Sequence, residues 1–167
     1  MTALSLISKV VPADQVASAY TRITQLEAAD TKDVIPTAGA DALLGAIPPG
    51  ASAIVTSGGV IVARARIAAA GLPPVRVLIT ADDVDRPKPD PQPFLLAADR
   101  LGVPASRCLA FEDSPAGARG AKDAGCTVVG VGGTCAPEEL DVDLWLDGLD
   151  RVRLAKRGTA YGLEPVG

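Results

Sequence analysis

The side chains in this sequence that are best suited to chemistry are a threonine, a lysine and a pair of acids. Thr56 follows an apolar run and precedes Ser57, Lys88 lies among prolines, and Glu112 and Asp113 follow a second apolar run. Carboxylate oxygens bind Mg²⁺, a lysine neutralises phosphoryl charge, and a hydroxyl with the backbone N–H groups that follow it binds phosphate oxygens. Together these residue types predict a site that binds a phosphate beside a divalent cation.

Each of these residues also has a purely structural interpretation. Asp113-Ser114-Pro115 is a good start for a helix, so the acidic pair also fits an N-cap. Thr56-Ser57-Gly58-Gly59 fits an ordinary connection from a strand to a helix, and Lys88 alone fits a solvated surface lysine. The flanking Pro87 and Pro89 favour a function for Lys88, because prolines fix the backbone where a charge must be held.

The elements that would position these residues alternate between short β-branched runs and longer amphipathic stretches. The β-branched runs predict strands over 51–56, 75–80, 107–111 and 127–131, with a short edge strand at 144–146. The periodic stretches, most of them closed by a glycine, predict helices over 60–70, 91–101 and 115–124, and a short one over 149–156. This alternation is typical of a Rossmann-like α/β fold, a parallel sheet with flanking helices whose ligands bind at the carboxyl ends of the strands.

The first part of the chain differs from this core. Helices are predicted over 13–29 and 38–47, and Pro48-Pro49-Gly50 breaks the second before the first strand. We therefore expect three parts, a helical segment over 1–36, the α/β core over 37–156 and a loose tail over 157–167. The segment 1–11 has no basic start and carries Lys9, so it is not interpreted as a signal peptide.

Composition excludes several classes of function. The net charge of −4 disfavours nucleic-acid binding, which needs a basic face. The absence of histidine excludes His-dependent triads and His–metal sites. Three cysteines without a paired spacing indicate reduced thiols and a cytoplasmic protein. No apolar segment reaches the roughly 18 to 20 residues needed to span a bilayer, so no membrane contact is expected.

Five short motifs occur in one order along the chain. They are Ala53-Ile-Val-Thr-Ser-Gly58, Ile79-Thr-Ala-Asp-Asp-Val84, Lys88-Pro-Asp-Pro91, Phe111-Glu-Asp-Ser-Pro-Ala-Gly117 and Ala124-Gly-Cys-Thr-Val-Val-Gly130. In this order the sequence resembles the haloacid dehalogenase (HAD) superfamily of phosphohydrolases, in its sugar- and polyol-phosphatase and β-phosphoglucomutase-like branch. The resemblance covers roughly residues 36–134, and the front helix resembles part of that branch's helical cap.

The resemblance implies a role for each candidate residue. Thr56 would bind the substrate phosphate with the backbone at Ser57 and Gly58, and Lys88 would stabilise the phosphoryl group and the nucleophile. The acidic pair, Glu112 and Asp113, would hold Mg²⁺. The implied substrate is a small phosphate monoester, a sugar or polyol phosphate.

The family's first motif, an Asp-x-Asp-Gly-Thr run that ends the first core strand, is absent from this sequence. In the family its first aspartate attacks phosphorus to give an aspartyl-phosphate, and its second acts as general acid and base. Asp141-Val-Asp143 has the spacing but lacks the following Gly-Thr, and 30–33 follows a helix rather than a strand. We therefore expect negligible turnover from these residues alone.

Three functions stay open at this stage. The first is an active phosphatase of which this chain is an incomplete version. The second is a catalytically inactive relative that binds a phosphate ligand or a protein partner. The third, and least favoured, is a receiver-like signalling domain. In the first case the central motif-one strand is missing between the strands that end at Thr56 and Phe111. An upstream segment, a partner chain or residues 1–11 would then have to complete the sheet.

Overall fold

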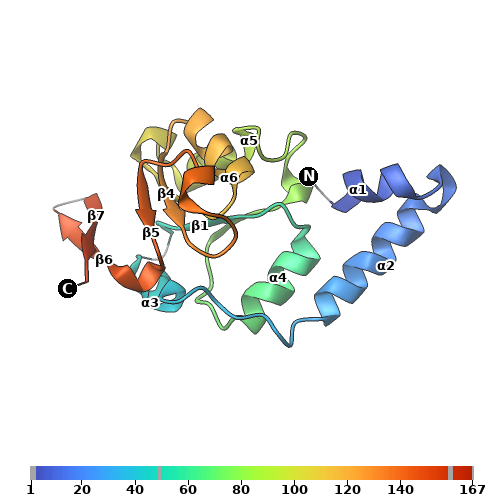
Figure 1. The fold of residues 1–167 in the computed structure, drawn as a ribbon, viewed down its shortest axis with the longest axis horizontal. Helices are drawn as coiled ribbons and strands as arrows, with labels where there is room; N and C mark the ends of the chain where they lie inside the picture. The colour runs from blue at the N-terminus through green and yellow to red at the C-terminus, as the bar shows by residue number, and fades with distance from the viewer. Residues whose placement is uncertain (1–2, 49, 158–159, 167) are drawn as a thin grey trace.

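The computed structural model describes residues 3–48, 50–157 and 160–166, so predictions for 1–2, 49, 158–159 and 167 lie outside the described residues. The chain forms an α/β fold with parallel strands, as the sequence predicts. Figure 1 shows α1 (Ala3–Val10) and α2 (Val16–Ala29) at one end of the molecule. The strands β6 (Val152–Arg157) and β7 (Ala160–Pro165) form a hairpin at the opposite end.

The core strands form two parallel sheets between these ends. One sheet pairs β1 (Ala53–Val55) with β2 (Val77–Ile79). The other has the order β3 (Leu109–Glu112), β4 (Thr127–Val131) and β5 (Leu144–Leu146). Within the described part of the chain, no backbone ladder joins β1 to β3.

A continuous helical layer covers one side of this interrupted sheet. The helix α5 (Gln92–Leu101) packs on β1 and β2, α6 (Pro115–Asp123) packs on β3 and β4, and the two helices pack on each other. Their small residues allow this close approach, because Ala118 and Ala121 of α6 are almost fully buried. The remaining helices are α3 (Ala40–Ala46) and α4 (Val60–Ala69), with short 3₁₀ turns η1 (Ala13–Gln15), η2 (Ala81–Asp83), η3 (Ala105–Arg107), η4 (Pro137–Glu139) and η5 (Leu149–Arg151).

Local sequence signals explain where the core helices begin and end. Ser114 caps α6 by accepting a hydrogen bond from the Gly117 N–H, and Pro115 occupies the first helical position. Gly102 ends α5 at a φ of 72°, a left-handed conformation that glycine adopts without steric cost. These signals are local, so the sequence predicts the core helices to within a residue or two.

Two segments differ from their predictions. The single helix predicted over 13–29 divides into η1 and α2. The helix predicted over 149–156 and the loose tail predicted over 157–167 are wrong, because a hairpin occupies most of this region. Val152 and Leu154 are half-buried while Arg153 is exposed, the alternation that a strand produces, and an Arg153–Glu164 ion pair crosses the hairpin at 3.2 Å.

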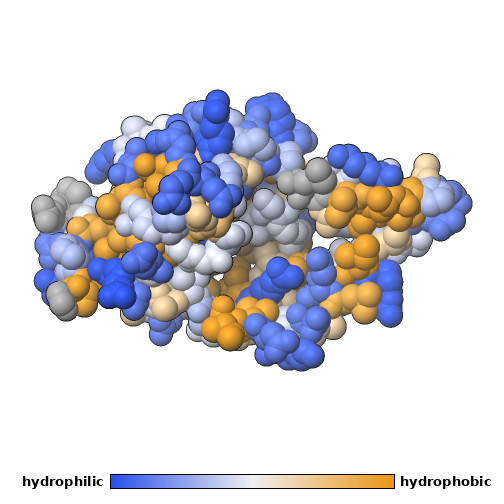
Figure 2. Space-filling view, viewed as in Figure 1, coloured by the Kyte–Doolittle hydropathy of each residue, from blue (hydrophilic) through white to orange (hydrophobic). Residues whose placement is uncertain are grey.

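Apolar side chains remain exposed over the first helices. Figure 2 shows an orange surface over α1 and α2, and Leu4, Leu6 and Val10 of α1 are all exposed. Among the described residues, no helix is both long and apolar enough to span a membrane. The division of the chain at 36/37 and 156/157 stays a prediction.

Candidate phosphate and metal site

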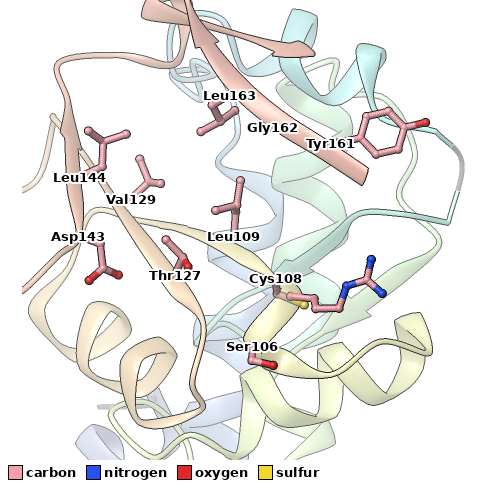
Figure 3. A pocket seen from close by; sticks show the side chains of 11 residues that line it. Ser106, Cys108, Leu109, Thr127, Val129, Asp143, Leu144, Tyr161, Gly162 and Leu163 are labelled. Carbon is pink, nitrogen blue, oxygen red and sulfur yellow. The ribbon is translucent and has the colours of Figure 1, made fainter. Parts of the chain in front are cut away.

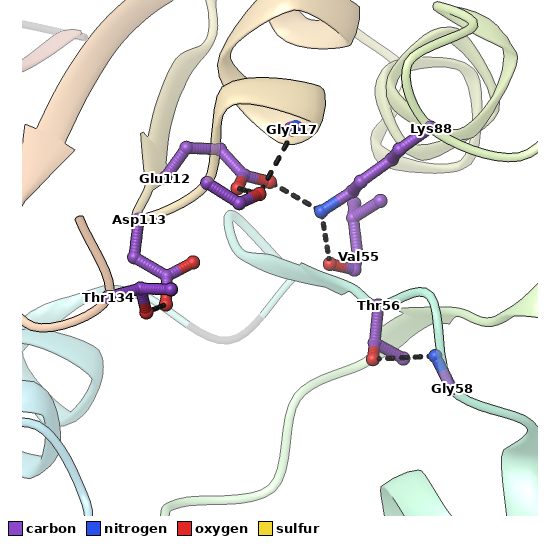
Figure 4. A network of polar contacts seen from close by, with 9 residues as sticks. Val55, Thr56, Gly58, Lys88, Glu112, Asp113, Gly117 and Thr134 are labelled. Carbon is purple, nitrogen blue, oxygen red and sulfur yellow. Dashed lines mark hydrogen bonds and ion pairs between the residues drawn. The ribbon is translucent and has the colours of Figure 1, made fainter. Parts of the chain in front are cut away.

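The predicted site residues lie at the carboxyl ends of β1 and β3. Figure 4 shows that Lys88 reaches between these two strands. Its Nζ donates a hydrogen bond to the Val55 carbonyl oxygen, the last of β1, at 3.1 Å and forms an ion pair with Glu112, the last residue of β3. One side chain therefore connects two strands that no backbone ladder joins.

The Lys88–Glu112 ion pair is buried. The exposed fractions of the two side chains are 11% and 7%, and the Lys88 Nζ also lies 4.9 Å from the centre of the Phe94 ring. The neighbouring Arg86–Asp90 pair has an arginine that is 68% exposed. An unpaired charge in this buried position would cost folding free energy. The Lys88 ammonium and the Glu112 carboxylate are therefore stable there only as a pair.

The helix start at α6 holds the Glu112 carboxylate from the other side. Its Oε2 accepts a hydrogen bond from Ser114 Oγ at 3.1 Å, and Ser114 Oγ accepts one from the Gly117 N–H at 3.2 Å. A Cβ on Gly117 would collide with the Glu112 carboxylate. The expected helix start is therefore confirmed, with Ser114 rather than either acid as the N-cap, and the functional role of Glu112 and Asp113 stays a prediction.

Asp113 faces away from this pair. It is exposed, and its carboxylate accepts a hydrogen bond from Thr134 Oγ1 in the loop after β4 (Figure 4). Glu112 has both oxygens engaged, whereas Asp113 has its carboxylate at the surface. Asp113 is thus the acid of the pair that is more open to an added ligand.

The loop after β1 places the Thr56 hydroxyl and the next amides at the same edge. Thr56 continues the strand pairing through its N–H, which donates to the Ile79 carbonyl at 2.9 Å. Its Oγ1 accepts a hydrogen bond from the Gly58 N–H at 3.1 Å, and Ser57 between them is exposed. The structure therefore brings Lys88 to Glu112 and Val55, whereas the hydrogen bond of the Thr56 hydroxyl stays within its own loop.

Asp82 contacts this loop, although the sequence placed it only at the strand edge without assigning it a role. Its Oδ2 accepts a hydrogen bond from the Val60 N–H at 2.8 Å. The signals in the sequence were its position after the second predicted strand and its place in the Ile79–Val84 motif, and neither indicates a contact with Val60, 22 residues away.

The acids at this edge fit a hard divalent cation in their chemistry. Glu112 and Asp113 supply only oxygen donors, which suit Mg²⁺ or Mn²⁺ better than Zn²⁺. Within the described residues, no group of three or more His, Cys, Asp or Glu side chains converges as a metal site. Two carboxylates alone predict weak binding of the cation.

Comparison with known proteins defines the class. Residues 5–125 match the haloacid dehalogenase-like hydrolase family, and the chain belongs to this family. It is 39% identical over 145 residues to hexitol phosphatase A of Escherichia coli, covering 85% of this chain and 67% of that protein. It is 43% identical over 102 residues to validoxylamine A 7'-phosphate phosphatase of Streptomyces hygroscopicus, covering 60% of this chain and 48% of that protein.

A solved structure gives the same class. The crystal structure of CbbY from Rhodobacter sphaeroides in complex with phosphate has a TM-score of 0.67 and 28% identity to this chain, covering 84% of this chain and 65% of that one. The resemblance to the sugar- and polyol-phosphatase branch is therefore confirmed. The chain spans about half to two thirds of the length of these relatives.

Proposed function

We propose that this protein acts in the hydrolysis of a sugar or polyol phosphate at the carboxyl edge of β1 and β3. The observation that carries this proposal is the buried Lys88 that bridges Val55 and Glu112 beside the Thr56 loop. A buried ammonium at a strand edge suits a phosphoryl group, which offers it a second negative partner. The phosphatase names of the two sequence relatives favour hydrolysis over a role confined to ligand binding.

Each residue takes a distinct part in this proposal. The Thr56 hydroxyl and the backbone of Ser57 and Gly58 bind the phosphate oxygens, and Lys88 balances their charge. The acids Glu112 and Asp113 hold Mg²⁺, with Asp113 the more accessible. When bound, the ion would withdraw charge from the phosphoryl oxygens.

The nucleophile of the proposed reaction lies outside this sequence. Hydrolysis through an aspartyl-phosphate needs an aspartate at the end of a strand, and no Asp-x-Asp-Gly-Thr run occurs here. We infer that this aspartate arrives on an extended segment that lies between β1 and β3, where the two sheets lack a common ladder. An added strand would pair with the inner edges of both and place its carboxyl end beside Lys88.

The origin of this strand is tested by the mass of the protein isolated from its own host. An upstream segment predicts a polypeptide heavier than 16.9 kDa. A soluble, cooperatively folding monomer of 16.9 kDa would contradict that origin.

The free cysteines Cys108, Cys126 and Cys135 support the expected cytoplasmic setting, since reduced thiols are typical of that compartment.

Phosphate release from a hexitol phosphate tests the mechanism. The 167-residue chain with Mg²⁺ is expected to show negligible turnover, because its residues only stabilise charge around a nucleophile supplied elsewhere. A Mg²⁺-dependent rate that disappears in Asp113→Ala would place the nucleophile within this chain.

Calorimetry tests the proposed metal site. It is expected to show weak binding of Mg²⁺ or Mn²⁺, and tight Zn²⁺ binding that depends on Glu112 and Asp113 would contradict the proposed metal site.

A further inference from the structure

The helix that follows the Thr56 loop has no cap of its own. Gly59 is the N-cap residue of α4 and has no side chain with which to accept the first N–H groups of the helix. The structure supplies the acceptor from another part of the chain, because Asp82 Oδ2 receives the Val60 N–H at 2.8 Å. A carboxylate at this position also interacts favourably with the positive end of the helix dipole.

A second hydrogen bond connects the same two segments. The Ala81 N–H donates to the Gly58 carbonyl oxygen at 3.0 Å. The Thr56–Gly59 loop is thus attached to η2 on both sides of Gly59, through Gly58 and through Val60. The N–H groups of this loop are the ones that the proposed function assigns to phosphate oxygens.

Gly59 leaves room for this attachment. A Cβ at Gly59 would lie 3.3 Å from Asp82 Oδ2 and 3.2 Å from the hydroxyl oxygen of Tyr20, which reaches the loop from α2. Both distances are shorter than ordinary van der Waals contacts. The absent side chain therefore allows the carboxylate to approach the helix start.

The segment that carries Asp82 is itself held firmly. Thr80 is almost fully buried, and its Oγ1 accepts the Asp82 N–H at 3.3 Å and donates to Asp83 Oδ2 at 2.7 Å. Asp83 also pairs with Arg100 at 2.9 Å. The two adjacent acids thus have separate tasks, since Asp83 stabilises its own turn and Asp82 reaches the loop.

We propose that Asp82 is a positioning residue that fixes the phosphate-binding loop by capping α4 from the η2 turn. This inference rests on the proposed function of the loop. Asp82 does not touch the phosphate, and its side chain acts through the Val60 backbone N–H. Its loss leaves the Ala81–Gly58 hydrogen bond as the connection between the loop and η2, so the loop amides are held less firmly in one arrangement.

The test compares Asp82→Ala with Asp83→Ala by NMR in the full 167-residue chain. In Asp82→Ala, exchange of the Val60 amide hydrogen should accelerate about fivefold, the fold-change that corresponds to a typical capping interaction. The dissociation constant for inorganic phosphate should rise by about fivefold on the same grounds. Asp83→Ala should lower stability yet leave phosphate affinity within about twofold, and Asp82→Asn should restore most of both readouts because its amide oxygen still accepts a hydrogen bond.

The outcomes separate this inference from the proposed function. Equal phosphate affinity in wild type and Asp82→Ala, or equal losses in Asp82→Ala and Asp83→Ala, would overturn the positioning role. If the wild-type chain itself does not bind phosphate, the proposed function fails, and the Val60 exchange rate alone decides whether Asp82 fixes the loop. If Asp82→Ala does not fold, Asp82→Ser, which keeps a shorter acceptor, takes its place with intermediate values expected.

Discussion

The carboxyl and amino ends of the sheet strands carry opposite kinds of surface. At the carboxyl ends, the buried Lys88 connects β1 to β3 through the Val55 carbonyl oxygen and Glu112, and Asp113 and the Thr56 loop lie at the same edge. At the amino ends lies a pocket of about 380 Å³. Figure 3 shows side chains of β3, β4, β5 and β7 that line it. Its lining includes Leu109, Leu144 and Tyr161, which are all exposed.

The charged side chains at the two ends differ in their exposure to water. The amino-end cavity has charged groups such as Arg107 and Asp143 at its border, where water solvates them. The carboxyl ends keep a charge pair away from water, which costs free energy unless both partners are present. This contrast between a buried, paired charge and an exposed apolar pocket supports the proposal that the carboxyl ends hold the functional site. Substitutions at the two ends should therefore have different consequences.

The largest expected effect is the loss of stability when the buried pair is broken. Glu112→Ala leaves the Lys88 ammonium without its partner and should lower the free energy of unfolding by about 3–5 kcal/mol. Arg86→Ala, which removes the exposed pair with Asp90, should cost less than about 1 kcal/mol. Urea denaturation measures both, and equal costs would show that burial of the Lys88 pair has no consequence.

A smaller effect is expected from filling the space beside Glu112. Gly117→Ala places a methyl group against the Glu112 carboxylate and should destabilise the fold by about 1–3 kcal/mol. Gly45→Ala is the matched control, since a Cβ there meets no atom within 4 Å and alanine favours the helix by up to about 1 kcal/mol. Thermal unfolding should move in opposite directions for the two variants, and a shift in the same direction would contradict the crowding at Gly117.

The sequence could predict the parts of this site that depend on local signals. Ser114, Pro115 and Gly102 determine helix ends within a few residues, so the core helices agree with their expected ranges. The rule that ligands bind at the carboxyl ends of parallel strands also predicted that Lys88 and Glu112 lie at one edge. The hairpin at 152–165 was missed because its alternation is short and is mixed with charged residues.

Contacts between distant residues could not be predicted from the pattern. Lys88 and Glu112 are 24 residues apart, and their pairing depends on the packing of α5, which lies on β1, against α6, which lies on β3. The capping of Val60 by Asp82 depends in the same way on the pairing of β1 with β2. Such contacts follow from the packing of whole helices and strands, which the local sequence pattern does not specify.

A modest effect is expected from pH at the amino ends. The Val128 N–H, which donates to Asp143 Oδ2 at 2.7 Å, holds the pKa of that carboxyl below its usual value, and Lys122 adds to this. Because the pKa is depressed in the folded state, this stabilisation is present above the ordinary carboxyl pKa and is lost as the pH falls through the folded-state pKa. The urea midpoints of wild type and Asp143→Asn should therefore converge as the pH falls below the ordinary carboxyl pKa, and a constant difference would contradict the shift.

The smallest effect is expected inside the amino-end cavity. Leu109→Ser removes an exposed apolar side chain and should change stability by no more than about 0.5 kcal/mol. It should leave phosphate affinity unchanged, since Leu109 lies at the opposite end of β3 from Glu112. A loss of phosphate affinity in this variant, measured by calorimetry, would show that phosphate binds at the amino ends and would contradict its placement at the carboxyl ends.

The most direct test of the account is the binding of inorganic phosphate to the 167-residue chain with Mg²⁺ present. Lys88→Met keeps most of the apolar stem and removes the charge, so phosphate affinity should fall at least about tenfold, as expected for the loss of a charge-assisted hydrogen bond. The double variant Lys88→Met with Glu112→Gln, which leaves no uncompensated charge, should fold and still bind phosphate weakly. Phosphate affinity equal to that of wild type in both variants would contradict the assignment of this edge as the phosphate site.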